Sequence, residues 1–235
     1  MEEITFRHPS VDTEITLRTS FPKDFIWRCI TKAQSFYDPW QTKKVVELGF
    51  IKPNSVAYDA GANIGNHTVC WATQHTDTQF IAVEANPLVF QCLQENIEHN
   101  CPTNASALNA ILNSSSEKME SVLKKGDEGS SVVQKACGDD AVFSRTLSEI
   151  HFSQFGQSVP CSFIKIDAEG YDFEVLKGAE LLLDTFNPAI VIEVWPQDVC
   201  LKAGVPYLGS KVSDFLEAKA YRLLCKTGTN WYFQK

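Results

Sequence analysis

The segment from Ser55 to Gly65, Ser-Val-Ala-Tyr-Asp-Ala-Gly-Ala-Asn-Ile-Gly, constrains the fold of this 235-residue chain more than any other. Its apolar run ends at Asp59, and Gly61 and Gly65 come before an amphipathic segment that begins at Asn66. This order indicates a buried strand, a tight turn and the start of a helix. Glycine in such a turn permits positive φ and a close approach of the backbone to a ligand. The unpaired N–H groups at the helix start suit an anion such as a carboxylate.

A second carboxylate lies at the spacing that a nucleotide-binding fold requires. The apolar run 80–83 ends at Glu84, about 20 residues after the turn, where an acid meets ribose hydroxyls. The fingerprint G-x-G-x-x-G is missing, which argues against an NAD-dependent dehydrogenase. Asp59 would repel a pyrophosphate but suits the ammonium group of an amino acid. A ligand that joins an amino acid to adenosine is S-adenosylmethionine, so we predict this cofactor.

Three sequence blocks follow one another along the chain. They are Asp59-Ala-Gly-Ala-Asn-Ile-Gly65, Glu84-Ala-Asn-Pro87, and Ile164-Lys-Ile-Asp-Ala-Glu-Gly170 followed by Val175-Leu-Lys-Gly178. With these blocks, residues 56–194 resemble the FkbM-type family of S-adenosylmethionine-dependent (class I) methyltransferases. The resemblance implies O-methylation and an α/β, Rossmann-like fold. That fold has a mostly parallel seven-stranded sheet, helices on both faces and an antiparallel last strand.

The resemblance also indicates which residues form the site. We assign cofactor binding to Asp59, Gly61, Asn63, Gly65, Asn66, His67, Glu84, Ala85, Asn86 and Asn109. We assign catalytic roles to Asp167, Glu169 and Lys165. After the third strand the family continues Ala-Leu-Gly-Asp, whereas this chain has Ile111-Leu-Asn-Ser114, so the adenine contact departs from the family pattern. Residues 113–145 correspond to an insertion that frames the active site in related proteins.

Four carboxylates fall at the ends of predicted strands, namely Asp59, Glu84, Asp167 and Glu193. Because ligands of open parallel sheets bind beyond the carboxyl ends of the strands, we expect these acids to share one site. Methyl transfer to a hydroxyl requires alignment of the nucleophile, the methyl carbon and sulfur, and removal of a proton. Asp167 is therefore our candidate for the base, and Glu169 for the group that orients the acceptor.

Other roles for these residues stay open. Asp167 could instead cap the helix that follows it or pair with Lys165, because a lysine inside an apolar strand needs a partner. Glu193 is a second candidate partner for Lys165. Asp167, Glu169 and Glu193 are also hard oxygen ligands suited to Mg²⁺, an alternative that we do not favour. His67, beside the glycine turn, is a second candidate base.

Apolar strands alternate with helical segments, which predicts βαβ units and a parallel sheet. The predicted strands are 55–59, 79–84, 104–112, 161–167 and 189–194, the helices are 66–74, 87–99, 146–152, 173–184 and 211–219, and 221–225 and 231–233 form a closing hairpin. Residues 1–22 predict a hairpin or an edge strand, and 24–36 and 42–48 predict helices. We assign 1–52 to an N-terminal strand and helical cap on a methyltransferase domain, 53–235, in one globular unit. Tyr37, Asp38 and Trp40 are candidates for the ligand rim or for a helix–helix turn with a buried tryptophan.

Composition narrows the choice of partners. A net charge of −8 and a pI of about 5.1 argue against an extended nucleic-acid surface. No secretory signal and no apolar run of membrane-spanning length are visible, and eight scattered cysteines without a C-x-x-C pair predict reduced thiols in the cytoplasm. We expect a small-molecule or glycan acceptor, such as a sugar, a glycan precursor or a glycosylated natural product. The alternatives are a cofactor-binding module without catalysis, or a methyltransferase that acts on a lipid, a peptide or RNA.

Overall fold

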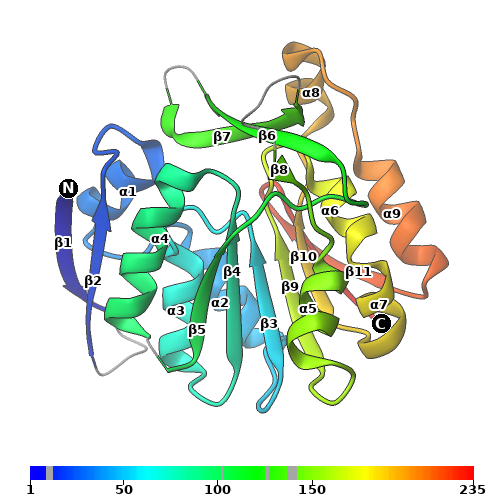
Figure 1. The fold of residues 1–235 in the computed structure, drawn as a ribbon, viewed down its shortest axis with the longest axis horizontal. Helices are drawn as coiled ribbons and strands as arrows, with labels where there is room; N and C mark the ends of the chain where they lie inside the picture. Colours follow the sequence, from blue (N-terminus) through cyan, green and yellow to red (C-terminus); the bar gives the residue numbers. More distant parts are fainter. Residues whose placement is uncertain (9–12, 102, 125–126, 137–141) are drawn as a thin grey trace.

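The computed structural model describes residues 1–8, 13–101, 103–124, 127–136 and 142–235, and for residues 123–124, 127–132 and 203 it describes the backbone alone. Seven strands form the central sheet: β3 (Val56–Ala60), β4 (Gln79–Glu84), β5 (Ala105–Asn109), β9 (Cys161–Ile166), β10 (Ala189–Glu193), β11 (Arg222–Thr227) and β12 (Asn230–Gln234). Their order is β11-β12-β10-β9-β3-β4-β5 (Figure 1). Neighbouring strands pair in parallel except β12, which is antiparallel to both β10 and β11. The predicted class I methyltransferase architecture is therefore confirmed.

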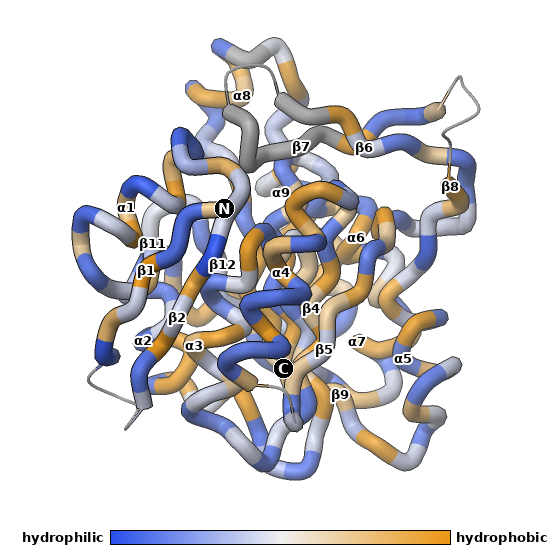
Figure 2. The backbone as a smooth tube through the Cα atoms, turned by 60° about the vertical axis from the view of Figure 1, so that its left-hand side comes forward, coloured by the Kyte–Doolittle hydropathy of each residue, from blue (hydrophilic) through white to orange (hydrophobic). Residues whose placement is uncertain are grey.

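Helices cover both faces of this sheet, because the side chains of each strand alternate between two apolar clusters. In β3, Ala57 belongs to one cluster, while Val56 and Tyr58 belong to the other. The first cluster packs against α1 (Phe25–Ala33), α2 (Pro39–Glu47), α3 (Asn66–Gln74) and α4 (Pro87–Asn100), and the second against α5 (Leu147–Phe155), α6 (Asp172–Gly178), α7 (Glu180–Phe186) and α9 (Gly209–Ala218). Figure 2 shows α4 as largely hydrophilic along its outer side, as expected for a helix that covers one face of a core.

A side chain at the start of α4 helps to fix where strand β4 ends. Asn86 accepts hydrogen bonds from the backbone N–H groups of Leu88 and Val89 at 2.8 and 3.3 Å, and Pro87 occupies the first helical position. Asn86 thereby begins α4 only two residues after β4 ends at Glu84. The local sequence thus places the Glu84 carboxyl at the edge of the sheet.

Two asparagines of α4 fasten the N-terminal hairpin, which consists of β1 (Glu2–Arg7) and β2 (Glu14–Thr19). Asn96 Oδ1 accepts from the N–H of Arg18 at 2.7 Å, and Asn100 Oδ1 accepts from the N–H of Thr16 at 3.0 Å. Each amide group also donates to the carbonyl of the same partner. Side chains therefore satisfy backbone groups of β2 that a further strand would otherwise pair. The hairpin predicted in residues 1–22 is confirmed.

A second, antiparallel sheet is built from the insertion after β5. It comprises β6 (Lys118–Lys124), β7 (Asp127–Lys135) and β8 (Val142–Phe143) and crosses above the carboxyl ends of the central strands (Figure 1). Two sequence predictions were wrong near this insertion. The strand predicted to reach residue 112 ends at Asn109, and the helix predicted at 173–184 is interrupted at Ala179. Gly178 precedes this break and packs so tightly that a Cβ there would lie 2.2 Å from the carbonyl oxygen of Asn113.

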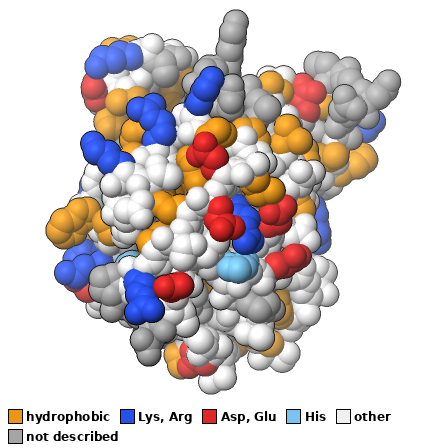
Figure 3. All heavy atoms as spheres, turned by 90° about the vertical axis from the view of Figure 1, so that its left-hand side faces the viewer, with side chains coloured by type: hydrophobic (Ala, Val, Ile, Leu, Met, Phe, Trp, Pro, Cys, Tyr) orange, Lys and Arg blue, Asp and Glu red, His pale blue; other side chains and the backbone are white. Residues whose placement is uncertain are grey.

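The structure adds α8 (Gln197–Ala203), which the sequence analysis did not predict. Seven cysteines within the described residues are free thiols, as expected, and Cys137 lies outside the described residues. Within the described part of the chain, no helix combines the length and the apolar character needed to cross a membrane. On the face in Figure 3, the coloured Lys and Arg side chains are interspersed with acidic and hydrophobic ones and form no broad basic area.

Candidate active site

A cavity opens at the carboxyl edge of the central sheet, bordered by the glycine turn, the ends of β4 and β9, and Val133 of β7. We call it the first cavity. Nine of the residues assigned from the sequence line it, namely Gly61, Asn63, Asn66, His67, Glu84, Ala85, Lys165, Asp167 and Glu169. Four assigned residues are not among its lining, namely Asp59, Gly65, Asn86 and Asn109. Residues that the sequence analysis did not assign complete the walls, among them Ala62, Ala110, Leu112 and Tyr171.

The glycine turn is shaped by contacts within the protein. Gly61 has a φ of 80°, and a Cβ there would lie 1.8 Å from the backbone oxygen of Asp167. Gly65 has a φ of 89°, and its Cβ would lie 2.9 Å from Leu93 Cδ1. The predicted positive φ is therefore correct, but the close approach that excludes a side chain is to the backbone after β9. Glycine at position 61 lets the turn and the end of β9 meet at the floor of the cavity.

Glu84 occupies the position expected for a ribose-binding acid. Its Oε2 accepts from the N–H of Asn63 at 3.0 Å, and its Oε1 accepts from the N–H of Asn86 at 2.8 Å. Burial raises the pKa of Glu84 to about 7, although these backbone hydrogen bonds favour the ionised form. The carboxyl group is thus held rigidly at the cavity wall. Asn86 acts through this hydrogen bond and through the helix cap, beside the cavity rather than in it.

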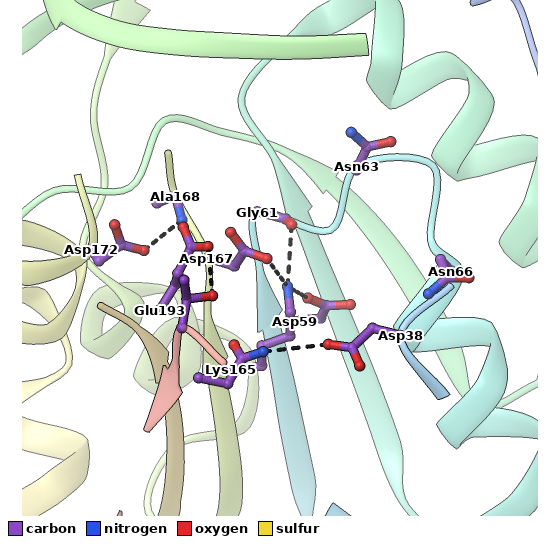
Figure 4. A network of polar contacts seen from close by, with 12 residues as sticks. Asp38, Asp59, Gly61, Asn63, Asn66, Lys165, Asp167, Ala168, Asp172 and Glu193 are labelled. Carbon is purple, nitrogen blue, oxygen red and sulfur yellow. Dashed lines mark hydrogen bonds and ion pairs between the residues drawn. The ribbon is translucent and has the colours of Figure 1, made fainter. Parts of the chain in front are cut away.

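Asp59 and Lys165 form a buried ion pair beneath the cavity. The strand register places them directly opposite each other, and Lys165 Nζ lies 3.0 Å from Asp59 Oδ1. The other oxygen of Asp59 accepts from the Thr68 hydroxyl at 2.7 Å. Both oxygens of Asp59 therefore have protein partners and Asp59 does not line the first cavity, so its role as the partner of a ligand ammonium stays a prediction. Lys165 also lies 3.4 Å from Asp167 Oδ2 and donates to the Gly61 carbonyl at 3.4 Å, as Figure 4 shows.

The partner of Lys165 is thus chiefly Asp59, with Asp167 second, and the structure records no ion pair between Lys165 and Glu193. Burial alone would raise the pKa of Asp59, but the charge of Lys165 and the hydrogen bonds to Asp59 outweigh burial and hold that pKa below its ordinary value. Burial would lower the pKa of Lys165, but the charges of Asp59 and Asp167 raise it. Both groups are charged at neutral pH, and together they join the glycine turn to β9.

A second group of carboxyls lies on the other side of Asp167 (Figure 4). Asp172, which the sequence analysis did not assign, accepts from the N–H groups of Ala168 at 2.7 Å and Gly170 at 3.0 Å. It thereby holds the turn after β9. Burial, followed by the charge of Asp167, raises the pKa of Asp172 to about 7. The signal that could have identified Asp172 is its position at the first turn of the helix that follows Gly170.

Glu193, at the end of β10, accepts from Trp195 Nε1 at 2.7 Å and from the Thr229 hydroxyl at 3.1 Å. Burial, followed by the charges of Asp167 and Asp172, raises the pKa of Glu193 to about 8. The metal alternative requires Asp167, Glu169 and Glu193 to converge. Among the residues that the structure describes, no group of three or more His, Cys, Asp or Glu side chains is arranged to hold a metal ion.

His67 is buried on the cofactor side of the first cavity and stacks on Trp71 with ring centroids 5.4 Å apart. Its Nε2 is buried without a hydrogen-bond partner among the described residues. Burial, followed by the charge of Lys165, lowers the pKa of His67 to about 3. The ring is therefore neutral at neutral pH, and its protonated form is strongly disfavoured. These properties make His67 a poor proton acceptor and a suitable hydrogen-bonding partner for a neutral or anionic ligand group.

Tyr37 connects the N-terminal helices to the first cavity, which it lines. Its N–H donates to Asn66 Oδ1 at 2.8 Å, and Asn66 Nδ2 donates to the Tyr37 carbonyl at 3.0 Å. Asp38 begins α2 by accepting from the N–H of Gln41 at 3.2 Å. The predicted helix–helix turn is thus present, but its tryptophan is not buried, because Trp40 is 73% exposed and lies outside the cavity lining.

Comparisons with known proteins agree with this geometry. Residues 59–223 match the methyltransferase FkbM domain. The chain is 30% identical over 149 residues to the hexuronic acid methyltransferase AglP of Haloferax volcanii, a match that covers 62% of this chain and 60% of that protein. In fold it is similar to the methyltransferase FkbM from Methylobacillus flagellatus, with a TM-score of 0.53 and 17% identity over 91% of this chain and 60% of that one.

The fold is also similar to that of a caffeoyl-CoA O-methyltransferase candidate from Staphylococcus aureus, with a TM-score of 0.53 and 10% identity over 92% of this chain and 91% of that one. At these identities the two solved structures support the fold alone. The domain match shows the family, because it takes in more than half of the chain and every carboxylate of the first cavity. The chain therefore belongs to the FkbM family of methyltransferases.

Proposed function

We propose that this protein is an S-adenosylmethionine-dependent O-methyltransferase whose acceptor is a hydroxyl of a sugar, a glycan precursor or a glycosylated natural product. Family membership supports methyl transfer, and the relative from Haloferax volcanii, which is named for a hexuronic acid, supports a sugar. The observation that carries the proposal is the position of Glu84, whose backbone-anchored carboxyl lines the first cavity. A carboxylate has about four lone-pair sites, so Glu84 can also accept from two ribose hydroxyls.

The remaining walls of the first cavity fit the same cofactor. Val83, Ala110 and Leu112 provide an apolar surface for an adenine ring. When bound, the cofactor supplies an electrophilic methyl group on a sulfonium. The chain supplies alignment of the acceptor and a site for its proton.

Asp167 is the residue best placed to take that proton. It lies at the end of β9, beside Gly61, and the ion pair with Lys165 at 3.4 Å orients its carboxylate. Its side chain is 35% exposed, in contrast to the 2% exposure of the Asp59 side chain, so an acceptor can reach it. Asp167 accepts the proton of the acceptor hydroxyl, and Glu169, which also lines the cavity, orients the acceptor.

Titration calorimetry with S-adenosylhomocysteine, followed by transfer of a labelled methyl group to a panel of glycosides, tests the proposal. We expect binding in the low-micromolar range, about −7 to −8 kcal/mol. Asp167→Asn should lower kcat by about 10²–10⁴-fold with little change in cofactor affinity. Asp77→Asn, at the opposite edge of the sheet, is the matched control. Absence of binding refutes the proposal, and full turnover of Asp167→Asn removes Asp167 as the base. Cofactor binding without transfer to any acceptor would favour the non-catalytic module.

A further inference from the structure

A second cavity lies next to the first, on the side of α8 and α9. It is bordered by the turn after β9, the segment that follows β10, and the loop 204–208 between α8 and α9. Val133, Glu169 and Tyr171 line both cavities, so the two spaces adjoin at the turn that follows Asp167. The second cavity has a volume of about 300 Å³, which reaches the lower end of the range for small-molecule sites and suits a sugar ring.

Most of the wall is apolar. Val194, Val205, Leu208 and Val212 line it, and Tyr171 and Trp195 add aromatic rings. Aromatic rings beside apolar groups suit the C–H face of a sugar, and they also attract ammonium groups. The wall therefore accommodates a sugar ring and does not, by itself, select the substituents of that ring.

The charged groups of the lining select among the possible substituents of the sugar. Glu169, Asp172 and Glu193 line the second cavity, and its described lining contains no Lys, Arg or His. The nearest cation along β9, Lys165, is already paired with Asp59 and Asp167. Lys135 of β7 is a surface residue whose Nζ lies 3.0 Å from Glu117 Oε2. Apart from the phenol of Tyr171 and the thiol of Cys200, the ionisable groups in the described lining of the second cavity are thus carboxyls, and no cation lies there to receive an anion.

Two of these carboxyls, those of Asp172 and Glu193, are held in place by hydrogen bonds within the protein. Both oxygens of Asp172 accept backbone N–H groups, and both oxygens of Glu193 accept side-chain donors, Trp195 and Thr229. Figure 4 shows Asp172 and Glu193 on the same side of Asp167. Burial raises the pKa of Asp172 to about 7 and of Glu193 to about 8, so an ammonium group beside them would favour their ionised forms and receive charged hydrogen bonds, whereas a carboxylate on the acceptor would meet no cation and would raise those pKa values further.

We propose that the second cavity holds the acceptor and that this acceptor is a sugar carrying an amino group and no carboxylate. This inference rests on the proposed function and narrows its substrate class. It separates this protein from the relative from Haloferax volcanii, whose name specifies a hexuronic acid.

Methyl glucoside and two derivatives, each altered at one position, test the inference: methyl glucosaminide carries an amino group at C2, and methyl glucuronide carries a carboxylate at C6. Binding of each to the protein saturated with S-adenosylhomocysteine and the kcat/KM for transfer of a labelled methyl group are both measured. We expect the glucosaminide to exceed the glucuronide by about 100-fold in kcat/KM, with the glucoside between them. Equal or better use of the glucuronide, or no binding of the glucosaminide, overturns the inference.

Two variants keep the test independent of folding. Val205→Lys places a cation at an exposed position of the cavity wall and should raise the relative use of the glucuronide by about 10-fold. Leu201→Lys adds the same charge on α8, where residue 201 is 82% exposed and lies outside the lining, and should leave the preference unchanged. An equal shift in both variants overturns the inference. Failure of S-adenosylhomocysteine to bind refutes the proposed function instead, so the two failures are distinguishable.

Discussion

Substituting Lys165 by methionine tests whether the buried ion pair under the first cavity holds the active site together. Lys165 is 1% exposed, and its ammonium contacts Asp59 at 3.0 Å, Asp167 at 3.4 Å and the carbonyl of Gly61 at 3.4 Å. Methionine retains the apolar stem but removes the charge and the donors. Asp59, which is 1% exposed, would then be an uncompensated buried carboxylate.

Breaking a buried pair from one side costs about 3–5 kcal/mol. For a chain of this length, 1 kcal/mol shifts the melting temperature by about 2–4 °C, so Lys165→Met should lower Tm by about 6–20 °C at pH 7. Lys219→Met is the matched control. Lys219 also contacts two carboxylates, at 2.8 and 2.9 Å, but Glu180 and Asp184 are more than half exposed, so the loss should stay within about 1 kcal/mol.

The pH dependence of unfolding distinguishes loss of the pair from loss of packing. In the wild type the pKa of Asp59 is lowered, so its stabilisation is present above its ordinary pKa and is lost only as pH falls through the folded value. Without Lys165, burial acts unopposed and raises the pKa of Asp59, so the variant gains stability as protonation becomes possible. The difference in Tm between wild type and variant should therefore narrow from pH 7 to pH 5.

Calorimetric melting of Lys165→Met, Lys165→Met/Asp59→Asn and the control at both pH values gives the answer. The double variant should recover part of the loss, because its buried amide carries no charge and can still accept from Thr68. A Tm of Lys165→Met within 2 °C of the wild-type value would refute the reasoning, because a shift that small corresponds to a loss of unfolding free energy below about 1 kcal/mol. A Tm difference that widens on acidification would refute it as well.

Two further predictions follow from residues of the first cavity. Since the pKa of Glu84 is raised to about 7 and its ionised form accepts ribose hydroxyls, affinity for S-adenosylhomocysteine should fall by about 30-fold between pH 8 and pH 5.5, and Glu84→Gln should bind weakly with no such dependence. If the affinity of Glu84→Gln fell with pH as steeply as that of the wild type, this role of Glu84 would be contradicted. Gly61→Ala should lower the free energy of unfolding by at least about 3 kcal/mol, because strain at positive φ adds to a clash with the backbone of Asp167. The control is Gly170→Ala. Gly170 also has a positive φ, 90°, but has open space around it, so this substitution should cost only about 1–2 kcal/mol. Equal losses in the two glycine variants, measured by denaturant unfolding, would show that the close approach at Gly61 is unimportant.

Local sequence determined the fold class and the row of acids at the sheet edge. Apolar runs that end at Asp59, Glu84, Asp167 and Glu193 alternate with helical segments, and this pattern is sufficient for a parallel sheet whose strand ends share one edge. The start of α4 was predictable for the same reason, because Asn86 and Pro87 act through hydrogen bonds and torsion angles within a few residues.

Tertiary structure alone decided which partner each polar group has. Asp59 faces Lys165 only because β9 lies beside β3 in a register that pairs those two residues, 106 positions apart in the chain. The reason for glycine at position 61 is likewise a backbone atom of Asp167, not the ligand that the local pattern suggested. The second cavity depends on the loop after α8, on β10 and on β7, which are distant in sequence and meet only in the folded chain. Periodicity specifies how a segment folds and which of its faces is buried, but strand order and register arise from packing between segments, so the roles of Asp59, Asp172 and Glu193 became visible only in three dimensions.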